Sequence, residues 1–126
     1  MAVKFNTTVK EVFILSDPTQ ITQIFNNLLH NAIQSIPIER TGEINIAVSI
    51  DEEFATVIVA DNGCGVADDI KEHLFLPNFT TKTNGMGLGL TIVKNLVIML
   101  GGEITFTSKL DEGTTFIVKF PLLKTE

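Results

Sequence analysis

Cysteine and long apolar runs are both scarce in this chain of 126 residues. The single cysteine, Cys64, cannot form an intrachain disulfide, and no cluster of cysteines is present to hold structural zinc. The most apolar expected helix, which includes residues 91–100, is interrupted by Lys94 and Asn95, and the first residues lack the apolar core of a signal peptide. These absences argue against a disulfide-stabilised secreted domain and indicate a reducing, cytoplasmic setting without direct membrane contact.

Basic residues are also few, with 9 Lys and Arg against 15 Asp and Glu and a formal net charge of -6. A surface that binds nucleic acid or an anionic membrane needs a basic face, so the charge argues against both kinds of partner. With 44% hydrophobic residues, the chain is long enough to bury one core and too short for two. We therefore expect residues 1–126 to form a single domain that is monomeric in isolation.

The order of the predicted elements indicates an α/β fold. Hydrophobic periodicity, with Asp17 as a helix cap and Gly101 and Gly102 as a helix stop, defines the expected elements. Helices are expected over residues 18–35, 67–75 and 88–100, and strands over 3–7, 12–15, 44–50, 54–60, 104–107 and 115–120. The run 54–60 is almost wholly apolar, which is typical of a central strand covered on both faces. This order predicts a two-layer sandwich, with a mixed, mostly antiparallel sheet of about five strands covered on one face by about three helices.

The first expected helix has an apolar face and an uncharged polar face. The apolar residues form one broad stripe that must be buried: Ile21, Ile24, Phe25, Leu28, Leu29, Ala32, Ile33 and Ile36. On the polar side, Asn27 and Asn31 are neighbours at i and i+4, and the Asn31 amide is expected to be half-buried at the edge of the stripe. A solvated polar face is the simpler interpretation. A side-chain carbonyl there could instead take one place on a Mg²⁺ ion whose other ligands are phosphate oxygens and water.

A second polar cluster, residues 61–65 with the sequence Asp-Asn-Gly-Cys-Gly, directly follows the apolar run 54–60. Asn-Gly is common in tight hairpins, but the second glycine and the lack of a clear strand after Val66 count against a simple hairpin. A carboxylate at the end of a buried strand can accept a hydrogen bond from an exocyclic amine, while glycine backbone lets a flat ring lie close. This arrangement suits adenine, with Cys64 as a small turn residue rather than a nucleophile.

Residues 84–90, Asn-Gly-Met-Gly-Leu-Gly-Leu, place glycines at alternate positions just before the second long helix. Glycines allow close approach of a ligand, and a helix start directs unpaired N–H groups and a positive dipole end toward an anion such as phosphate. The spacing matches neither the P-loop nor the dinucleotide-binding fingerprint. Because glycines also end helices and permit close packing, this stretch alone does not decide between those roles and an anion site.

Taken together and in order, these segments resemble the catalytic ATP-binding domain of sensor histidine kinases, within the superfamily of type II topoisomerases, heat-shock chaperone ATPases and mismatch-repair ATPases. Residues 23–32 resemble the family's N box, 61–65 its G1 box, 74–82 its F box and 85–90 its G2 box. Residues 113–116 are similar to the short glycine-threonine motif that closes the domain. The resemblance covers almost the whole chain. It implies the Bergerat-type ATP-binding fold, with ATP and Mg²⁺ as cofactors.

The resemblance also implies a role for each matching residue. Asp61 would hold the adenine amine, Asn31 would ligate Mg²⁺, and Asn27 would help to arrange the phosphates. Gly63 and Gly65 would shape the adenine pocket. The further nucleotide contacts implied are Phe79, Thr80, Thr81, Lys82, Gly85, Met86, Gly87, Leu88, Gly89, Leu90 and Thr114. Residues 80–84 would belong to a mobile ATP lid from which Lys82 reaches a phosphate, so Asn27, Asn31 and Lys82 are the expected catalytic residues.

Asn27 marks a contrast with the ATP-hydrolysing members of the superfamily. Those members carry a glutamate four residues before the magnesium asparagine, where it activates water. An amide is not a general base, so we expect poor hydrolysis and transfer to an outside acceptor. Two other positions depart from the family pattern, since Gln34 replaces a common lysine and Asn78 a common aromatic residue.

The family's phosphorylated histidine lies on a separate dimerising helical hairpin, which we do not find in this chain, so neither His30 nor His73 is expected to be the acceptor. We expect a histidine kinase catalytic domain that cannot autophosphorylate alone. It would donate the γ-phosphoryl group to the dimerisation domain of its parent kinase, from which the group would pass to a response regulator receiver domain. The sequence does not decide whether the parent kinase is anchored in a membrane. Two alternatives remain: a serine kinase of the same superfamily acting on a protein antagonist, and a non-catalytic, nucleotide-gated interaction module.

Overall fold

The computed structural model describes residues 2–7, 18–71, 74–75 and 89–122. Five strands form one sheet in the order β1-β2-β3-β5-β4, with bounds β1 (Ala2–Thr7), β2 (Glu43–Ile50), β3 (Phe54–Asp61), β4 (Glu103–Lys109) and β5 (Gly113–Pro121). β1 runs parallel to β2, and the other neighbouring strands are antiparallel. The described helices are α1 (Pro18–Ser35), α2 (Asp68–Lys71) and α3 (Gly89–Met99). The predicted mixed, mostly antiparallel sheet is confirmed.

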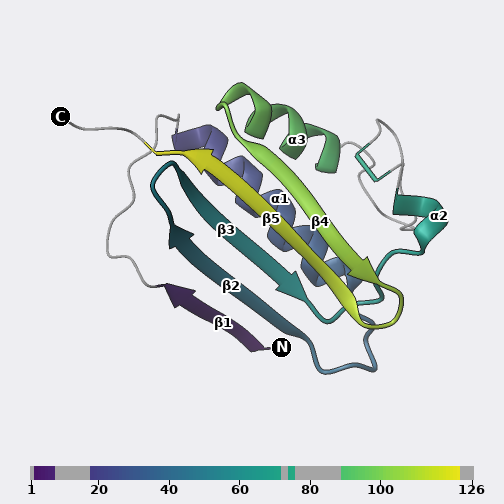
Figure 1. The fold of residues 1–126 in the computed structure, drawn as a ribbon. Coiled ribbons are helices and arrows are strands. Elements are labelled where there is room, and N and C mark those ends of the chain that lie inside the picture. The colour runs from purple at the N-terminus through teal and green to yellow at the C-terminus, as the bar shows by residue number, and fades with distance from the viewer. Residues whose placement is uncertain (1, 8–17, 72–73, 76–88, 123–126) are drawn as a thin grey trace.

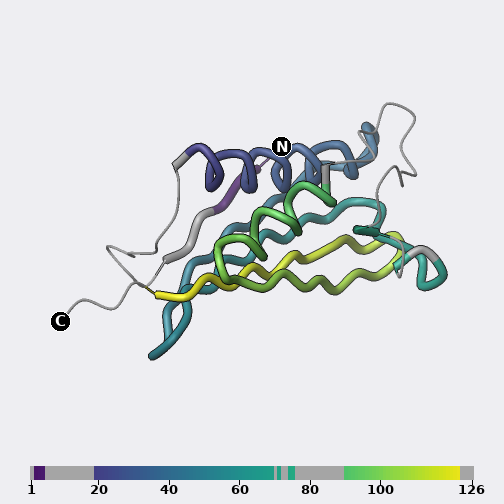
Figure 2. The backbone as a smooth tube through the Cα atoms, turned by 90° about the horizontal axis from the view of Figure 1, so that it is seen from above, coloured from purple at the N-terminus to yellow at the C-terminus, as the bar shows by residue number. Residues whose placement is uncertain are grey.

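Two helices, α1 and α3, lie antiparallel and side by side on one face of the sheet (Figures 1 and 2). The N-terminal end of α3 therefore lies beside the C-terminal half of α1. The short helix α2 lies beyond the end of β4 (Figure 1), so two of the described helices, rather than about three, cover the sheet. No helix in the described part of the chain is long and apolar enough to cross a membrane.

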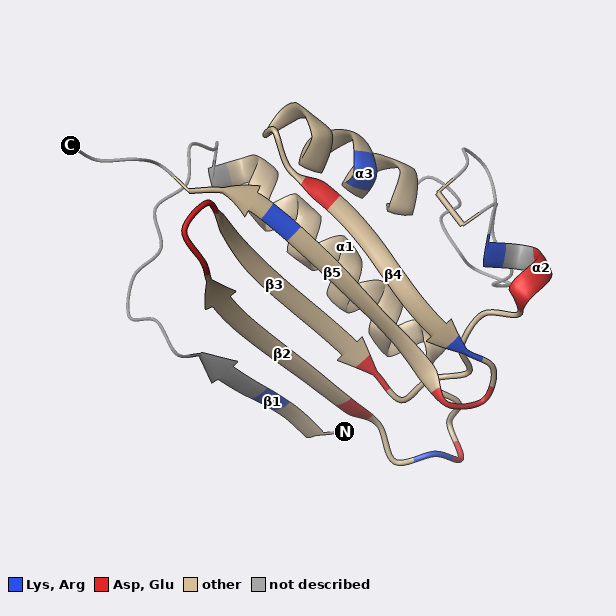
Figure 3. Cartoon of the chain, viewed as in Figure 1, with Lys and Arg blue, Asp and Glu red and all other residues tan. Residues whose placement is uncertain are grey.

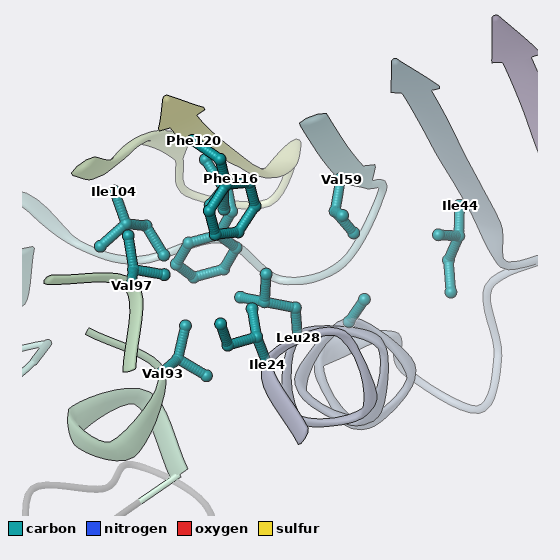
Figure 4. Close-up of a cluster of buried hydrophobic side chains, with 11 residues drawn as sticks. Ile24, Leu28, Ile44, Val59, Val93, Val97, Ile104, Phe116 and Phe120 are labelled. Carbon is teal, nitrogen blue, oxygen red and sulfur yellow. The ribbon is translucent and has the colours of Figure 1, made fainter. Parts of the chain in front are cut away.

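The hydrophobic core fills the space between these helices and the sheet. Ile24 and Leu28 of α1 are fully buried and point toward Phe116 of β5 (Figure 4). Val93 and Val97 of α3 complete the cluster from the other helix. Full burial of such a side chain stabilises the fold by about 1.5–3 kcal/mol relative to exposure, so these residues fix the rotation of α1 about its axis. That rotation leaves Asn27 and Asn31 half-buried at the edge of the helix.

Two expectations about burial are wrong. The apolar stripe predicts a buried Ile33, but this residue is 49% exposed, because it follows buried Ala32 by one residue and is turned about 100° away around the helix. β3 is the central strand, but it is not fully covered on both faces. Val59 is buried against the helices, whereas Ile58 points to the opposite face and is only half-buried. The strand predicted over 12–15 and the cap at Asp17 lie outside the described residues.

The expected end of the second long helix is confirmed. α3 ends at Met99, where the N–H groups of Gly101 and Gly102 donate to the carbonyls of Ile98 and Val97 at 2.9 Å each. Gly101 has φ +79°, a left-handed conformation in which glycine carries no Cβ penalty. The chain can therefore reverse directly into β4.

Candidate nucleotide-binding site

Asp61 is the last residue of β3 and is only 9% exposed. Its Oδ1 atom accepts hydrogen bonds from the backbone N–H groups of Gly63 at 2.8 Å and Thr114 at 3.3 Å. The hydroxyl of Ser35 also lies 3.2 Å from the same atom. Because these donors come from the following turn, from β5 and from the end of α1, the direction of the carboxylate is fixed by three elements.

The turn that follows Asp61 is held by the end of α1, the connection between α1 and β2, and the first residue of β2. The side-chain amide of Asn62 donates to the carbonyl of Thr41 at 2.9 Å, and its side-chain oxygen accepts from the N–H of Glu43 at 2.8 Å. The N–H of Cys64 donates to the carbonyl of Ser35 at 2.8 Å. Arg40 Nη1 donates to the carbonyls of Asn62 at 2.6 Å and Gly63 at 2.8 Å. The turn is therefore a built structure rather than the tip of a hairpin, and no strand follows it directly.

Gly63 and Gly65 are required by the packing of the protein itself. A Cβ atom at Gly63 would lie 2.2 Å from Ser35 Oγ, and one at Gly65 would lie 2.1 Å from the carbonyl oxygen of Lys109. Gly65 also has φ +69°, where L side chains are strained. These glycines were predicted to let a flat ring lie close to the backbone. In the structure, the space that a side chain would need is filled by Ser35 and Lys109 of the protein itself.

The β4–β5 hairpin closes the opposite side of this turn. Thr114 is 6% exposed and pairs with Asp61 across the β3–β5 ladder. The Ser108 hydroxyl accepts from the N–H of Val66 at 2.7 Å and lies 2.8 Å from the Thr114 hydroxyl. The N–H of Asp111 donates to the carbonyl of Cys64 at 2.7 Å. The sheet thus places Asp61 and Thr114, two of the expected nucleotide contacts, directly beside each other.

The two asparagines of α1 lie in a row with Ser35, at intervals of four residues. Residues four apart lie on the same side of a helix, and the rise of 1.5 Å per residue places Asn31 about 6 Å and Asn27 about 12 Å from Ser35 along the axis. Both amides are half-buried, and Ser35 contacts Asp61. The row therefore leads away from the Asp61 carboxylate along α1.

The chemistry of this row fits Mg²⁺ bound together with phosphates. In the described residues no group of three or more His, Cys, Asp and Glu could hold a metal ion. Nucleotide-bound Mg²⁺ needs no such cage, because one or two protein oxygens, phosphate oxygens and water complete its coordination. The half-buried Asn31 side-chain carbonyl is a suitable single protein ligand for that arrangement.

The beginning of α3 is fixed to residue Phe75. Thr91 Oγ1 donates to the Phe75 carbonyl at 2.7 Å, and Lys94 Nζ lies 5.3 Å from the centre of the Phe75 ring. The same ring packs edge-on against Phe106 of β4. α3 begins at Gly89, and this end of the helix lies beside the C-terminal half of α1, which contains Asn31 (Figure 2). The expected contacts Phe79, Thr80, Thr81, Lys82, Gly85, Met86, Gly87 and Leu88 lie outside the described residues.

Sequence reasoning missed Ser35, Arg40 and Ser108. A local signal existed for Ser35, which stands four residues after Asn31 on the same side of the helix. Arg40 had no local signal, because its partners are 22 and 23 residues away along the chain. Ser108 is likewise 42 residues from Val66, and only the sheet brings them together.

Comparison with known proteins places this chain in a family. The family model described as "Histidine kinase-, DNA gyrase B-, and HSP90-like ATPase" matches residues 16–124. The sensor histidine kinase ZraS of Escherichia coli strain K12 is 39% identical over 117 residues, covering 93% of this chain and 24% of that protein. Sporulation kinase D of Bacillus subtilis strain 168 is 31% identical over 115 residues, covering 91% of this chain and 22% of that protein.

Solved structures agree with these sequence relatives. The catalytic domain of histidine kinase ThkA, in a nucleotide-free form, superposes with a TM-score of 0.82 at 32% identity, covering 94% of this chain and 77% of that one. Full-length ShkA, solved in complex with AMPPNP, has a TM-score of 0.82 at 27% identity, covering 98% of this chain and 26% of that one. The chain therefore spans the greater part of an isolated catalytic domain, and about a quarter of a full-length relative.

Proposed function

The chain belongs to the family of histidine kinase-, DNA gyrase B- and HSP90-like ATPases, on the branch of the histidine kinase catalytic domains, and from this we propose a phosphoryl-transfer function. It binds ATP with Mg²⁺ and donates the γ-phosphoryl group to a histidine on a separate dimerisation domain of its parent kinase. A response regulator receiver domain is the next acceptor in the two-component pathway. The observation that supports this best is the Asp61 carboxylate, fixed from three sides at one end of the row formed by Asn27, Asn31 and Ser35.

The adenine end of the nucleotide is assigned to Asp61. An ionised carboxylate accepts the exocyclic amine of adenine in a charge-assisted hydrogen bond. Guanine presents a carbonyl oxygen at the corresponding position, and two acceptors would then oppose each other. Because Oδ1 is held by backbone N–H groups, little reorganisation is needed when the base binds, and adenine is favoured over guanine.

The phosphate end is assigned to Asn31, Asn27 and the beginning of α3. Bound Mg²⁺ supplies neutralisation of the charge that develops on the transferred phosphoryl group. Asn31 offers the metal its side-chain carbonyl, and Asn27 orients the phosphates one helical turn away. The first N–H groups and the positive dipole end of α3 favour the phosphate oxygens. Further phosphate contacts are proposed from the family motifs alone, for Lys82, Gly85, Gly87 and Leu88.

The row of α1 carries no general base for water. Asn27 stands where the ATP-hydrolysing relatives have glutamate, and an amide cannot take the proton of an attacking water. The γ-phosphoryl group is therefore preserved for an acceptor that another domain presents. His30 is exposed on α1, two residues after buried Leu28, and is not the proposed acceptor.

The proposed transfer is tested by mixing the chain with the dimerisation domain of its parent kinase and ATP labelled in the γ-phosphate. We expect label on that domain as phosphohistidine, which is lost in acid and kept in base, and none when the chain is incubated alone. Acid-stable phosphoserine on a protein antagonist would instead establish the serine kinase alternative. ATP binding without transfer to any acceptor would establish a nucleotide-gated interaction module.

A further inference from the structure

We propose that Arg40 is a positioning residue for nucleotide binding, acting through the backbone of the turn that carries Asp61. This inference rests on the proposed function, because it assumes that the turn binds adenine. Arg40 belongs to the connection between α1 and β2 and is the only arginine of the chain. The basic residues that the structure describes lie on separate elements and connections (Figure 3), so Arg40 acts as a single cation rather than as part of a basic patch. Its place in the sequence, between the N box and the G1 box, is outside both motifs.

The geometry joins one guanidinium nitrogen to two consecutive carbonyls. Arg40 Nη1 lies 2.6 Å from the Asn62 oxygen and 2.8 Å from the Gly63 oxygen. Hydrogen bonds from a charged donor are shorter and stronger than neutral ones. Together they fix the peptide planes that join Asn62 to Gly63 and Gly63 to Cys64, and both carbonyls are thereby directed to Arg40.

These peptide planes set the direction of the Asp61 carboxylate. The N–H of Gly63, which donates to Asp61 Oδ1 at 2.8 Å, belongs to the same peptide unit as the Asn62 carbonyl that Arg40 holds. Rotating that unit moves its N–H and C=O together, because the peptide is planar. The turn also contains two glycines, Gly63 and Gly65, whose backbones resist rotation less than other residues do. Loss of the guanidinium therefore loosens the donor that orients the carboxylate.

Other contacts from the end of α1, from the α1–β2 connection and from the start of β2 keep the turn in place when Arg40 is changed. Asn62 remains bonded to Thr41 and Glu43, and Cys64 to the Ser35 carbonyl. Arg40 is half-buried at the surface of the domain and outside the hydrophobic core. Its removal should consequently affect the precision of the turn more than the stability of the fold.

The proposal is tested by titrating the purified chain with ATP·Mg²⁺ and ADP·Mg²⁺ in a calorimeter, and by urea unfolding without nucleotide. For Arg40→Ala we expect Kd to rise about tenfold for both nucleotides, equivalent to about 1.4 kcal/mol. The two rises should match, because Arg40 acts at the adenine end. Arg40→Lys keeps a charged donor but replaces the rigid guanidinium by an ammonium on a flexible stem, so its Kd values should fall between those of the wild type and Arg40→Ala. Lys119→Ala, which removes a cation from the exposed face of β5, is the matched control and should bind as the wild type does.

Chemical modification of Arg40 tests the same proposal without a substitution. Phenylglyoxal modifies arginine side chains, and in this chain it has one such target. Modification of the folded protein should weaken ATP binding as Arg40→Ala does. An unchanged Kd for both nucleotides, in the modified protein or in folded Arg40→Ala, would overturn the proposal. A weaker affinity for ATP with an unchanged affinity for ADP would also overturn it, because that result would indicate a phosphate contact. The same holds if Arg40→Lys binds the nucleotides as weakly as Arg40→Ala does. A wild-type chain that binds neither nucleotide would contradict the proposed function itself.

Discussion

The hydroxyl of Ser35, the last residue of α1, lies 3.2 Å from Oδ1 of Asp61, the last residue of β3. The same hydroxyl lies 2.8 Å from the Ala32 carbonyl within the helix. A serine has one hydroxyl proton, so it donates to one of these acceptors at a time. The contact joins the helix that carries Asn31 to the strand that carries the candidate adenine carboxylate. A rotation of α1 would therefore disturb the adenine end and the phosphate end of the proposed nucleotide site together. The core side chains of α1 oppose such a rotation and so keep the spacing between Asn31 and Asp61.

Asp61→Asn tests the adenine assignment. The side-chain oxygen of the substituted amide could still accept from Gly63 and Thr114, but the charge that favours the adenine amine would be lost. We expect ATP binding weaker by about 1.5–3 kcal/mol, the range for a hydrogen bond to a charged group. Calorimetry measures the change, and Asp51→Asn, in the turn between β2 and β3, is the control for loss of one negative charge. An unchanged affinity of Asp61→Asn would rule out the adenine contact.

Asn31→Ala tests the magnesium ligand. The substitution removes the carbonyl proposed for Mg²⁺ while keeping good helix propensity. In the wild type, ATP should bind more tightly with Mg²⁺ than with EDTA. We expect the ratio of these two affinities to be about tenfold smaller in Asn31→Ala, equal to about 1.4 kcal/mol. Asn26→Ala, at an exposed position of the same helix, should keep the ratio of the wild type. If both variants respond to Mg²⁺ as the wild type does, Asn31 is not the ligand.

Gly65→Ala tests the packing of the turn against the β4–β5 hairpin. Both Gly65 and Gly101 have positive φ, at +69° and +79°, so alanine at either position carries a left-handed conformational penalty of about 1–2 kcal/mol. A Cβ at Gly65 would also lie 2.1 Å from a backbone oxygen, whereas one at Gly101 would meet only a proline ring carbon at 3.4 Å. Urea unfolding should show Gly65→Ala to be clearly the less stable of the two. Equal stabilities would mean that the hairpin moves aside.

Asp51→Ala tests the acid dependence of the β2–β3 turn. Hydrogen bonds from the N–H groups of Phe54 and Glu53 hold the pKa of Asp51 below its ordinary value of 3.8. A carboxyl whose pKa is lower in the folded state stabilises the fold above its unfolded pKa and loses that contribution as the pH falls through the folded one. The stability advantage of the wild type over Asp51→Ala should therefore be constant near neutral pH and shrink below about pH 4.

Urea unfolding at a series of pH values measures this advantage. Glu52→Ala removes a carboxylate from the same turn and serves as the control for net charge. An advantage of the wild type that stays constant down to about pH 3 would show that the charged form of Asp51 contributes nothing to the turn.

The elements and the family of this protein follow from local features of the sequence. Helix periodicity predicted α1 to Ser35, and the two glycines after Leu100 predicted the end of α3, because both signals act over a few residues. Asp61 could be singled out because a carboxylate ended an apolar strand run. The order of the motifs predicted the histidine kinase relationship that the comparisons confirmed. The contacts expected from Phe79 to Leu88 stay predictions.

Only the tertiary structure decided how the site is supported. Arg40 meets Asn62 and Gly63 because α1 and β2 return the chain to the end of β3, and no pattern in the sequence marks contacts between residues so far apart. Ser108 reaches Val66 for the same reason. The sheet has helices on one face, so Ile58 is half-buried although its sequence run is as apolar as a fully covered strand. Local residue preferences set the elements and the candidate ligands. The packing of those elements determined which backbone groups and side chains hold Asp61 in place.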